Sequence, residues 1–596
     1  MNEDVYDARE QNEYRYLVQE EGEEEVQYCR RSYVSPFLVL SRRCIFLICC
    51  GVLCLLTLAG YLAYVAQTPP RGFVDVYTEC GEIWGRVKDG VYSFKGIPYA
   101  VPPVGDRRWK PPANLLESGL CWKGVYDATR SRDMCAQVHP MDEHGKVLGE
   151  EDCLHLSVWT PTLQTDAKLP VMVWLHGGFL HMLSGSEKGY SPSEELTAQT
   201  GLVYVSLNYR LNAFGFLALE LLRQGSPTNT SGNYGFMDQI AALQWVQRNI
   251  HVFGGDPGNV TLFGQSSGGT SVWTMMMSPL AKGLFHRAID MSGSYIYNSS
   301  LEKAEKDNLV FLNNSGCQDL ACLHKLSKAQ VLKAIPWKEY PYWAAEDLTD
   351  LPMKNRFVGP VAVVDGYVLP DAPFKMWEKG KGYNDVPFVI GTTEQEVDFS
   401  PPYQNISVWT WDDYRWFVTD KLTPFGRNLS KQVLDLYPVS EKCPTKDRCP
   451  ERLYTTIVSD MRETCPNNDL ASRAAKALKS PVYRYVVTHT PSKQASVSKL
   501  LPFPSRFSFH LLDSLAFFRG LKAVLGETSL QDDSFQDTMT KYFIHFAKTG
   551  EMPGEWPQYP PYTALLSSNI TVAQNYSAMR CTLWEQNGFY PYAWIN

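Results

Sequence analysis

A serine flanked by glycines lies in the segment GQSSG (residues 264–268), directly after the apolar run VTLF (residues 260–263). A hydroxyl group becomes an effective nucleophile only beside a general base, and a G-x-S-x-G turn between a strand and a helix exposes a serine for that role. Flanking glycines let neighbouring elements pack closely around the strained turn. The alternative is a Gly/Ser turn without chemistry. The strand-turn-helix setting favours Ser266 as a nucleophile for acyl transfer.

A second segment could stabilise the negative charge that such an attack creates on a carbonyl oxygen. The run PVMVWL (residues 170–175) opens into the loop HGGF (residues 176–179). Glycine amides in a loop of this type can approach and bind an oxyanion, together with the amide that follows the nucleophile. We therefore expect the N–H groups of Gly177, Gly178 and Ser267 to form an oxyanion hole.

The elements around these segments indicate an α/β fold. Three β-branched and aromatic runs, at residues 170–175, 202–207 and 260–263, are bounded by Gly, Asn or Pro, as buried central strands are. Residues 238–249 repeat apolar side chains at helical spacing, with Asp at the start and Arg near the end to match the helix dipole. This alternation predicts βαβ units and a central, mostly parallel sheet flanked by helices.

Further motifs follow one another along the chain: GIPYA at 96–100, EDCL at 151–154, NYRL at 208–211, GNYG at 232–235 and SGS at 292–294. With the two segments above, they resemble the type B carboxylesterase and cholinesterase family, from about Gly81 to the C-terminus. The resemblance implies an α/β-hydrolase fold, a Ser–Glu–His triad, an acyl-enzyme, and no metal or organic cofactor. Ser292 matches a serine beside the triad in that family. The sequence contains no HExxH, Walker A or complete GxGxxG string.

The acid of this triad is sought after the run VPFVI (residues 386–390). Three carboxyl groups follow that run: Glu394, Glu396 and Asp398. All three qualify on chemistry alone. Similarity to the family's G-x-x-x-D-E pattern selects Glu396, although Gln395 and Val397 replace the Asp and Gly that usually flank it.

Three histidines lie downstream of the acid: His489, His510 and His545. His489 ends an expected strand and His545 lies in an amphipathic helical stretch, so a structural role suits both. His510, in the segment FHLLDSL (residues 509–515), resembles the family's histidine loop. In the implied triad His510 takes the proton from Ser266, while Glu396 fixes the tautomer and stabilises the imidazolium.

The large domain contains ten cysteines, and an even set in an oxidising compartment predicts disulfides. It has no C-x-x-C pair of the kind that binds zinc. The family resemblance implies the pairs Cys135–Cys153, Cys317–Cys322 and Cys465–Cys581. The remaining four cysteines then pair, by elimination, as Cys80–Cys121 and Cys443–Cys449.

The chain divides into an acidic tail at residues 1–43, an apolar run at 44–66 and the large domain at 67–596. The charge-free run is long enough to cross a bilayer as a helix. A cleaved signal peptide is the alternative, but its apolar part is shorter and begins nearer Met1. The arginines that flank the run lie mainly on its N-terminal side, at Arg30, Arg31, Arg42 and Arg43, against Arg71 after it. We therefore expect a single-pass type II membrane protein with its large domain extracellular or lumenal.

N-glycosylation sequons test this orientation independently, since they are modified only on the lumenal side. None precedes the apolar run, and seven candidates follow it, at Asn229, Asn298, Asn313, Asn405, Asn428, Asn569 and Asn575. An eighth sequon, at Asn259, falls in an expected core strand and is a poor acceptor. The positions of the sequons therefore predict the same orientation as the arginines, with the large domain on the extracellular or lumenal side.

Charge and aromatic content narrow the expected partners. The net charge is −8 and no dense Lys/Arg stripe lies outside the membrane flank, so nucleic acid is not an expected partner. Gln265 replaces the family's usual elbow Glu, which is associated with choline substrates. Residues 136–152 contain no aromatic side chain for a cation–π contact with choline. The expected substrates are therefore small neutral esters with short chains.

The rival interpretation is a cell-adhesion protein, because the same fold resembles neuroligins and neurotactin-like surface proteins that lack a complete triad. The membrane anchor, the sequons and the Tyr-rich tail suit that role, and a homodimer or a cell-surface protein partner is compatible with either function. However, all three triad positions and both loop glycines are present, which adhesion does not require. The sequence therefore favours the hydrolase. A lipase is a third interpretation, but no apolar lid can be located.

Overall fold

The computed structural model describes residues 42–67, 72–138, 145–295, 299–336, 362–398, 405–426, 428–440, 443, 448–497 and 504–594. The chain forms two compact units, Met1–Arg71 and Gly72–Asn596. Nearly all of the expected cytoplasmic tail, and the sequon at Asn298, lie outside the described residues.

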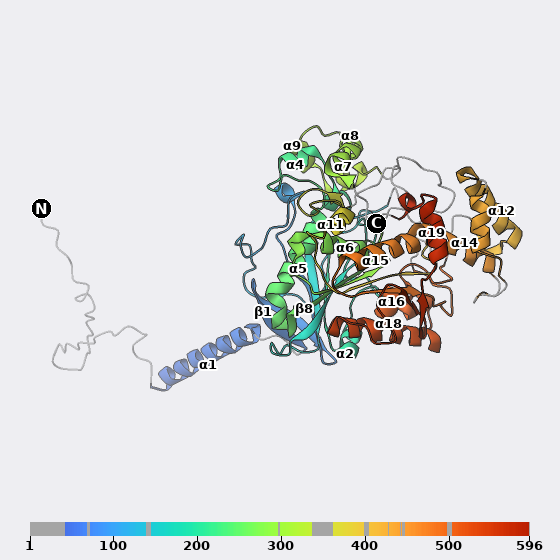
Figure 1. The fold of residues 1–596 in the computed structure, drawn as a ribbon. Helices are drawn as coiled ribbons and strands as arrows, with labels where there is room; N and C mark the ends of the chain where they lie inside the picture. The colour runs from blue at the N-terminus through green and yellow to red at the C-terminus, as the bar shows by residue number, and fades with distance from the viewer. Residues whose placement is uncertain are drawn as a thin grey trace, which may run out of the picture. The chain divides into compact units, whose positions relative to one another are not determined.

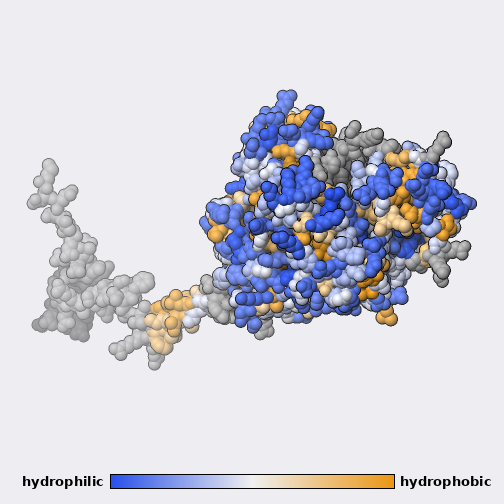
Figure 2. Space-filling model, viewed as in Figure 1, coloured by the Kyte–Doolittle hydropathy of each residue, from blue (hydrophilic) through white to orange (hydrophobic). Residues whose placement is uncertain are grey.

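The described part of the first unit is the helix α1 (Arg42–Gln67), which includes the whole apolar run expected at residues 44–66. Its large apolar side chains are exposed, among them Phe46, Leu53 and Leu56, and Figure 2 shows hydrophobic surface along this helix. Within the described residues, no helix reaches the length and hydropathy of a membrane-spanning segment.

A 13-stranded sheet forms the centre of the second unit (Figure 1). Its middle strands are parallel, in the order β7 (Val203–Leu207), β6 (Leu169–Leu175), β8 (Gly255–Gln265), β9 (Arg287–Met291), β12 (Phe388–Thr393), β13 (Val482–Val487) and β14 (Tyr562–Leu566). Antiparallel strands continue the sheet at both edges: β1 (Phe73–Thr78), β2 (Gly81–Lys88), β3 (Val91–Pro98) and β5 (His155–Thr160) on the β7 side, and β15 (Ile570–Gln574) beside β14. The prediction of a mostly parallel central sheet is confirmed.

Two short elements complete the strands. β4 (Tyr126–Asp127) pairs with β2, and β10 (Ser299–Ser300) pairs with β11 (Val363–Val364) in a separate ribbon.

The helices of this unit pack around the sheet (Figure 1). They are α2 (Glu194–Thr200), α3 (Asn212–Phe216), α4 (Glu220–Gln224), α5 (Tyr234–Asn249), α6 (Ser267–Met277), α7 (Leu301–Asp307), α8 (Leu309–Ser315), α9 (Leu320–Lys325), α10 (Lys328–Ala334), α11 (Pro373–Lys379), α12 (Trp411–Leu422), α13 (Leu429–Leu436), α14 (Cys449–Ser459), α15 (Cys465–Ala477), α16 (Leu512–Phe517), α17 (Leu521–Leu525), α18 (Leu530–Thr549) and α19 (Ala578–Gln586). A π-helical turn, η8 (Asp460–Thr464), joins α14 to α15, and a 3-10 turn, η9 (Tyr590–Tyr592), follows α19.

Alternate side chains of the central strands enter two separate apolar cores, because successive residues of a strand point to opposite faces of a sheet. In β6, Val171 and Val173 pack in the core that α5 and α6 cover. Met172 and Trp174 pack in the core that α16 and α18 cover. A third apolar cluster lies among α12, α13, α14 and α19, beside the sheet. The first two cores hold the strands β8, β9 and β12, from which the site is built, and the third includes Val397, just after β12.

Two expected elements are longer than their sequence patterns. Strand β8 begins at Gly255, before the apolar run, because that residue pairs with Leu169 across an irregularity in the register. Helix α5 begins at Tyr234 rather than at residue 238, directly after Asn233 in a left-handed turn with φ of 54°. Its first turn is buried on every side, so amphipathic spacing does not reveal it.

Five disulfides cross-link the second unit, and their pairs are the ones the sequence predicts: Cys80–Cys121, Cys135–Cys153, Cys317–Cys322, Cys443–Cys449 and Cys465–Cys581. The described sequon asparagines expected to be modified are all exposed: Asn229, Asn313, Asn405, Asn428, Asn569 and Asn575. Asn259 is only half exposed in β8, where its side chain contacts Arg287.

Candidate active site

Ser266 lies at a sharp turn between β8 and α6, the setting that the G-x-S-x-G pattern predicts. Its φ of 59° and ψ of −130° are strained for a residue with a side chain, and its N–H donates to the carbonyl of Met291 at 2.8 Å. A Cβ on Gly264 would collide with the carbonyl of Gly268, and one on Gly268 with the carbonyl of Leu175. Glycine is therefore required on both sides of the turn.

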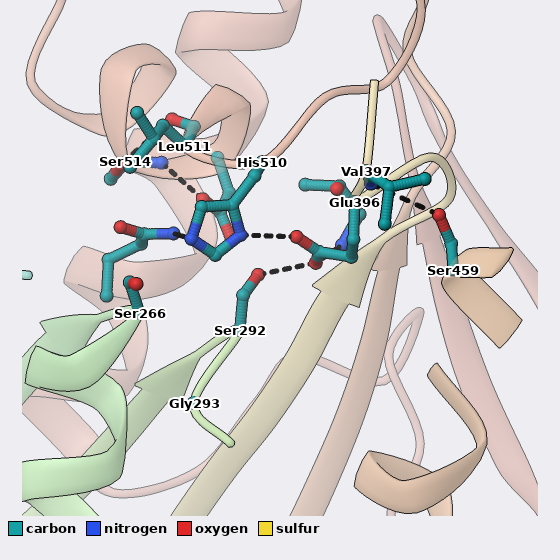
Figure 3. Close-up of polar contacts among 12 residues, drawn as sticks. Ser266, Ser292, Gly293, Glu396, Val397, Ser459, His510, Leu511 and Ser514 are labelled. Atoms are coloured by element: carbon teal, nitrogen blue, oxygen red, sulfur yellow. Dashed lines mark hydrogen bonds and ion pairs between the residues drawn. The ribbon is translucent and has the colours of Figure 1, made fainter. Parts of the chain in front are cut away.

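Glu396 follows β12 and is fully buried, with hydrogen bonds to both carboxylate oxygens (Figure 3). Oε1 accepts from the hydroxyl of Ser292 at 2.7 Å and from the N–H of Thr393 at 2.6 Å. Oε2 lies 2.5 Å from Nδ1 of His510, which donates to it. This arrangement fixes the Nδ1–H tautomer and leaves Nε2 of the imidazole as the proton acceptor.

Two local hydrogen bonds support the loops that carry this pair (Figure 3). The N–H of Val397 donates to the hydroxyl of Ser459 at 3.3 Å, in helix α14. The hydroxyl of Ser514 donates to the carbonyl of Leu511 at 2.8 Å, at the start of α16. Leu511 itself has a φ of 81°, so the chain turns sharply just after the histidine.

The other two candidate acids have separate structural partners. Glu394 forms an ion pair with Arg452 at 2.7 Å. Asp398 accepts from the backbone N–H of Arg506 at 2.6 Å and pairs with its guanidinium at 3.3 Å. Burial raises the pKa of Asp398 to about 7, although the guanidinium opposes that rise. Of the three candidate acids, only Glu396 therefore contacts the imidazole of His510.

The other candidate bases lie elsewhere. His489 contacts Asp532 at 2.9 Å and stacks on Phe535 with ring centroids 4.5 Å apart. Burial lowers the pKa of His489, and the contact with Asp532 opposes that shift. His545 lies within α18. Both positions fit the structural roles that the sequence suggests for them.

A neutral amide lies on the Nε2 side of His510, the side on which Figure 3 shows Ser266. The side-chain nitrogen of Gln265 is 3.1 Å from Nε2 and donates to it. The carbonyl oxygen of Gln265 accepts from the hydroxyl of Tyr190 at 2.6 Å. Burial raises the pKa of Tyr190 well above its usual value, so the phenol stays protonated. No motif marks Tyr190 in the sequence, because it lies in a loop far from the elbow.

The candidate oxyanion loop is fastened to the elbow in two ways. The N–H of Leu180 donates to the hydroxyl of Ser267 at 3.1 Å, and the N–H of Gly177 donates to the hydroxyl of Tyr190 at 3.1 Å. Gly178 has a φ of 107° and Phe179 one of 59°, so the loop turns in the left-handed region. Of the three expected oxyanion donors, the N–H of Gly177 is therefore already hydrogen-bonded, to the hydroxyl of Tyr190. Within the described part of the chain, no acceptor is found for the amides of Gly178 and Ser267.

Burial shifts the pKa of several titratable groups near Ser266, Glu396 and His510 toward the neutral form. Burial lowers the pKa of His176 to about 4, and its ring stacks on Tyr209 at 4.5 Å. Burial raises the pKa of Asp290 to about 8, and it raises that of Glu463 well above the usual range, with Glu396 adding to the rise. In each of these groups burial favours the uncharged form. Among the described residues, no three His, Cys, Asp or Glu side chains converge as a metal site.

Comparisons with known proteins agree with this geometry. The model of the carboxylesterase family matches residues 74–584. The para-nitrobenzyl esterase of Bacillus subtilis (strain 168) is 34% identical over 518 residues, which cover 83% of this chain and 95% of the relative. Neurotactin of Drosophila melanogaster is 30% identical over 495 residues, which cover 80% of this chain and 55% of the relative.

A solved structure of PNB esterase matches with a TM-score of 0.66 at 31% identity, and the match covers 86% of this chain and 99% of that structure. The fold predicted from the sequence motifs is therefore the fold of a known esterase. The family match extends over most of the second unit and includes the elbow, the acid and the histidine. The chain belongs to the carboxylesterase family.

Proposed function

We propose that this chain is a serine carboxylic ester hydrolase in which Ser266 is the nucleophile, His510 the base and Glu396 the acid. The hydrogen bond from His510 to Glu396 carries the proposal. At 2.5 Å, with the carboxylate held by two further donors, it orients Nε2 toward the elbow (Figure 3). Family membership supports the same chemistry, since the matched relatives include a para-nitrobenzyl esterase.

In the proposed reaction, the Ser266 oxygen bonds to the ester carbonyl carbon while its proton passes to Nε2 of His510. The oxyanion is bound by the amides of Gly178 and Ser267, and by that of Gly177 once Tyr190 releases it. The imidazolium then protonates the leaving alcohol, and an acyl-enzyme remains. Water, activated by the same base, attacks the acyl group and releases the carboxylic acid and the free serine.

The proposed substrates are small neutral esters with short acyl chains. Gln265 places an uncharged amide beside the imidazole at 3.1 Å, where a carboxylate would attract a cationic substrate. The neighbouring His176 is neutral, and Phe179 adds an apolar side chain next to the oxyanion loop. Electrostatic attraction for choline is therefore weak at this site.

A fluorophosphonate probe tests the nucleophile in the full-length protein. We expect Ser266-dependent labelling, which the Ser266→Ala variant abolishes. Hydrolysis of p-nitrophenyl acetate and butyrate should be lost in the same variant. Labelling that persists in Ser266→Ala, or a wild-type protein that neither labels nor hydrolyses these esters, would refute the proposal. Faster turnover of acetylthiocholine than of either neutral ester would refute the substrate assignment alone.

We also propose that α1 anchors the chain as a type II membrane protein with the second unit extracellular or lumenal. The charge-free run, the arginines before it and the exposed sequon asparagines of the second unit support this orientation. Treatment with an N-glycosidase should increase gel mobility. If protein made in a secretory pathway shows the same mobility before and after this treatment, the proposed orientation is contradicted.

Cell adhesion is the second candidate function, and the similarity to neurotactin over 80% of this chain favours considering it. In that case a cell-surface protein partner would bind the second unit, and a homodimer would carry two copies of that binding surface. Cell aggregation assays with wild-type protein and Ser266→Ala separate the two functions, since adhesion does not need the nucleophile.

A further inference from the structure

A tryptophan far from every site motif lies against the imidazole of His510. The rings of Trp594 and His510 meet edge to face, with centroids 5.5 Å apart and an interplanar angle of 88°. Trp594 is 3% exposed and His510 is likewise 3% exposed. An indole in this position covers one side of the catalytic base.

The segment that contains Tyr592 and Trp594 is held by two hydrogen bonds to one buried arginine, one to its backbone carbonyl and one from its guanidinium. The N–H of Trp594 donates to the carbonyl of Arg462 at 2.9 Å. The guanidinium of Arg462 donates to the carbonyl of Tyr592 at 2.7 Å. Arg462 lies in the π-helical turn η8 and is fully buried. π-Helical turns often occur at functional sites, and this one fixes the segment that carries the indole.

The same apolar cluster includes or packs against residues beside three parts of the reaction centre. Trp594 belongs to the third core, which also includes Val397, the residue directly after Glu396. Phe179, the residue directly after Gly178 in the oxyanion loop, packs against this cluster. Apolar side chains therefore extend from the histidine to the oxyanion loop. An ester bound with its carbonyl oxygen at that loop places its substituents near this surface.

We propose that Trp594 sets the size of the ester that the site accepts: its indole lies against His510, on the side of the third apolar cluster, and so selects small substituents. The proposal rests on the proposed esterase function and deepens it. Because a rigid indole cannot shrink to admit extra methylene groups, longer acyl chains bind only at the cost of displacing it. Short acyl chains fit without that displacement.

The test compares p-nitrophenyl acetate, butyrate and octanoate as substrates of the full-length wild-type, Trp594→Phe and Trp594→Ala proteins. We expect Trp594→Ala to raise the ratio of kcat/KM for octanoate over acetate by about tenfold or more, the scale of discrimination that one or two methylene groups give in an apolar pocket. The same ratio for Trp594→Phe should lie between those of wild type and Trp594→Ala. A thermal melt of each variant shows whether it is folded, and Trp594→Phe remains informative if Trp594→Ala does not fold.

Trp584→Phe is the matched control, because Trp584 lies in the same cluster but packs on Phe589 and donates to the hydroxyl of Tyr437 at 3.0 Å. We expect its chain-length ratio to equal that of wild type. An unchanged ratio in folded Trp594 variants, an equal loss for all three esters, or the same shift in Trp584→Phe would overturn the proposal. Wild-type protein that hydrolyses none of the esters and resists the fluorophosphonate would instead overturn the esterase function itself.

Discussion

Removing the hydroxyl of Ser292 should weaken the proposed triad of Ser266, His510 and Glu396 without disrupting it. Ser292 lies after β9 and donates to Oε1 of Glu396 at 2.7 Å, on the oxygen that does not contact His510. The side chain is fully buried, so no solvent replaces the lost donor. In Ser292→Ala the carboxylate keeps its bond to His510 but loses part of the support that orients it.

The size of the effect follows from the remaining contacts. A hydrogen bond to a charged group contributes about 1.5–3 kcal/mol. The N–H of Thr393 still donates to the same oxygen at 2.6 Å, so the lower figure applies. A loss of about 1.5 kcal/mol in transition-state stabilisation lowers kcat/KM roughly tenfold. Ser292 has a φ of 53°, and alanine adds no new strain there because both residues carry a Cβ.

The assay measures kcat/KM for p-nitrophenyl acetate and the rate of fluorophosphonate labelling, which should fall together. Ser294→Ala is the matched control: its side chain is equally buried in the same loop, and its hydroxyl has no hydrogen-bond partner among the described residues. We expect that variant to retain wild-type rates. A folded Ser292→Ala with unchanged rates, or one as inactive as Ser266→Ala, would refute this account of how the acid is held.

Two further variants test other parts of the site. Ser267→Ala keeps the backbone amide at the proposed oxyanion position but removes the hydroxyl that accepts from the Leu180 N–H. The loss of one neutral hydrogen bond should lower kcat/KM about fivefold. Equal kcat/KM in wild type and Ser267→Ala would contradict this expectation. Asp290→Asn tests the effect of burial, which raises the pKa of Asp290 to about 8 from 3.8. The folded protein keeps a proton that the unfolded chain releases between these values, so the free energy of unfolding falls as pH rises through this window, by about 1.4 kcal/mol per pH unit and roughly 4 kcal/mol by pH 7. The asparagine cannot ionise, and its Tm should exceed that of wild type at pH 8 but not at pH 4; parallel Tm curves across this range would contradict the assignment.

The sequence predicts those parts of the site that consist of neighbouring residues. Ser266 and the loop that contains Gly178 each carry a local pattern, because a tight turn between a strand and a helix requires small residues at fixed spacing. The choice of Glu396 over Glu394 depends on Arg452, which lies 58 residues from Glu394 in sequence. Spacing cannot reveal such an ion pair, and only the family resemblance distinguishes the carboxyl groups.

Tyr190 and Trp594 show the limit of pattern reading. Each contacts the site from a distant part of the chain: Tyr190 bonds Gln265, 75 residues away, as well as Gly177, and Trp594 lies against the imidazole of His510. Neither belongs to a motif, and an aromatic residue in a loop is most often part of a core. Their roles follow from how the sheet and the third apolar cluster fold together, which short sequence windows do not encode.

The proposed triad implies that ester hydrolysis begins only late in folding. Glu396 and His510 are separated by 114 residues, and Gln265 and His510 by 245. Such distant contacts form only after the parallel strands between them have paired, which is slow compared with local helix formation. If His510 is the proposed base, a partly folded chain has a serine but no oriented base, and it does not cleave esters during biosynthesis. Reactivity toward a fluorophosphonate would then report that the strands carrying these residues have paired.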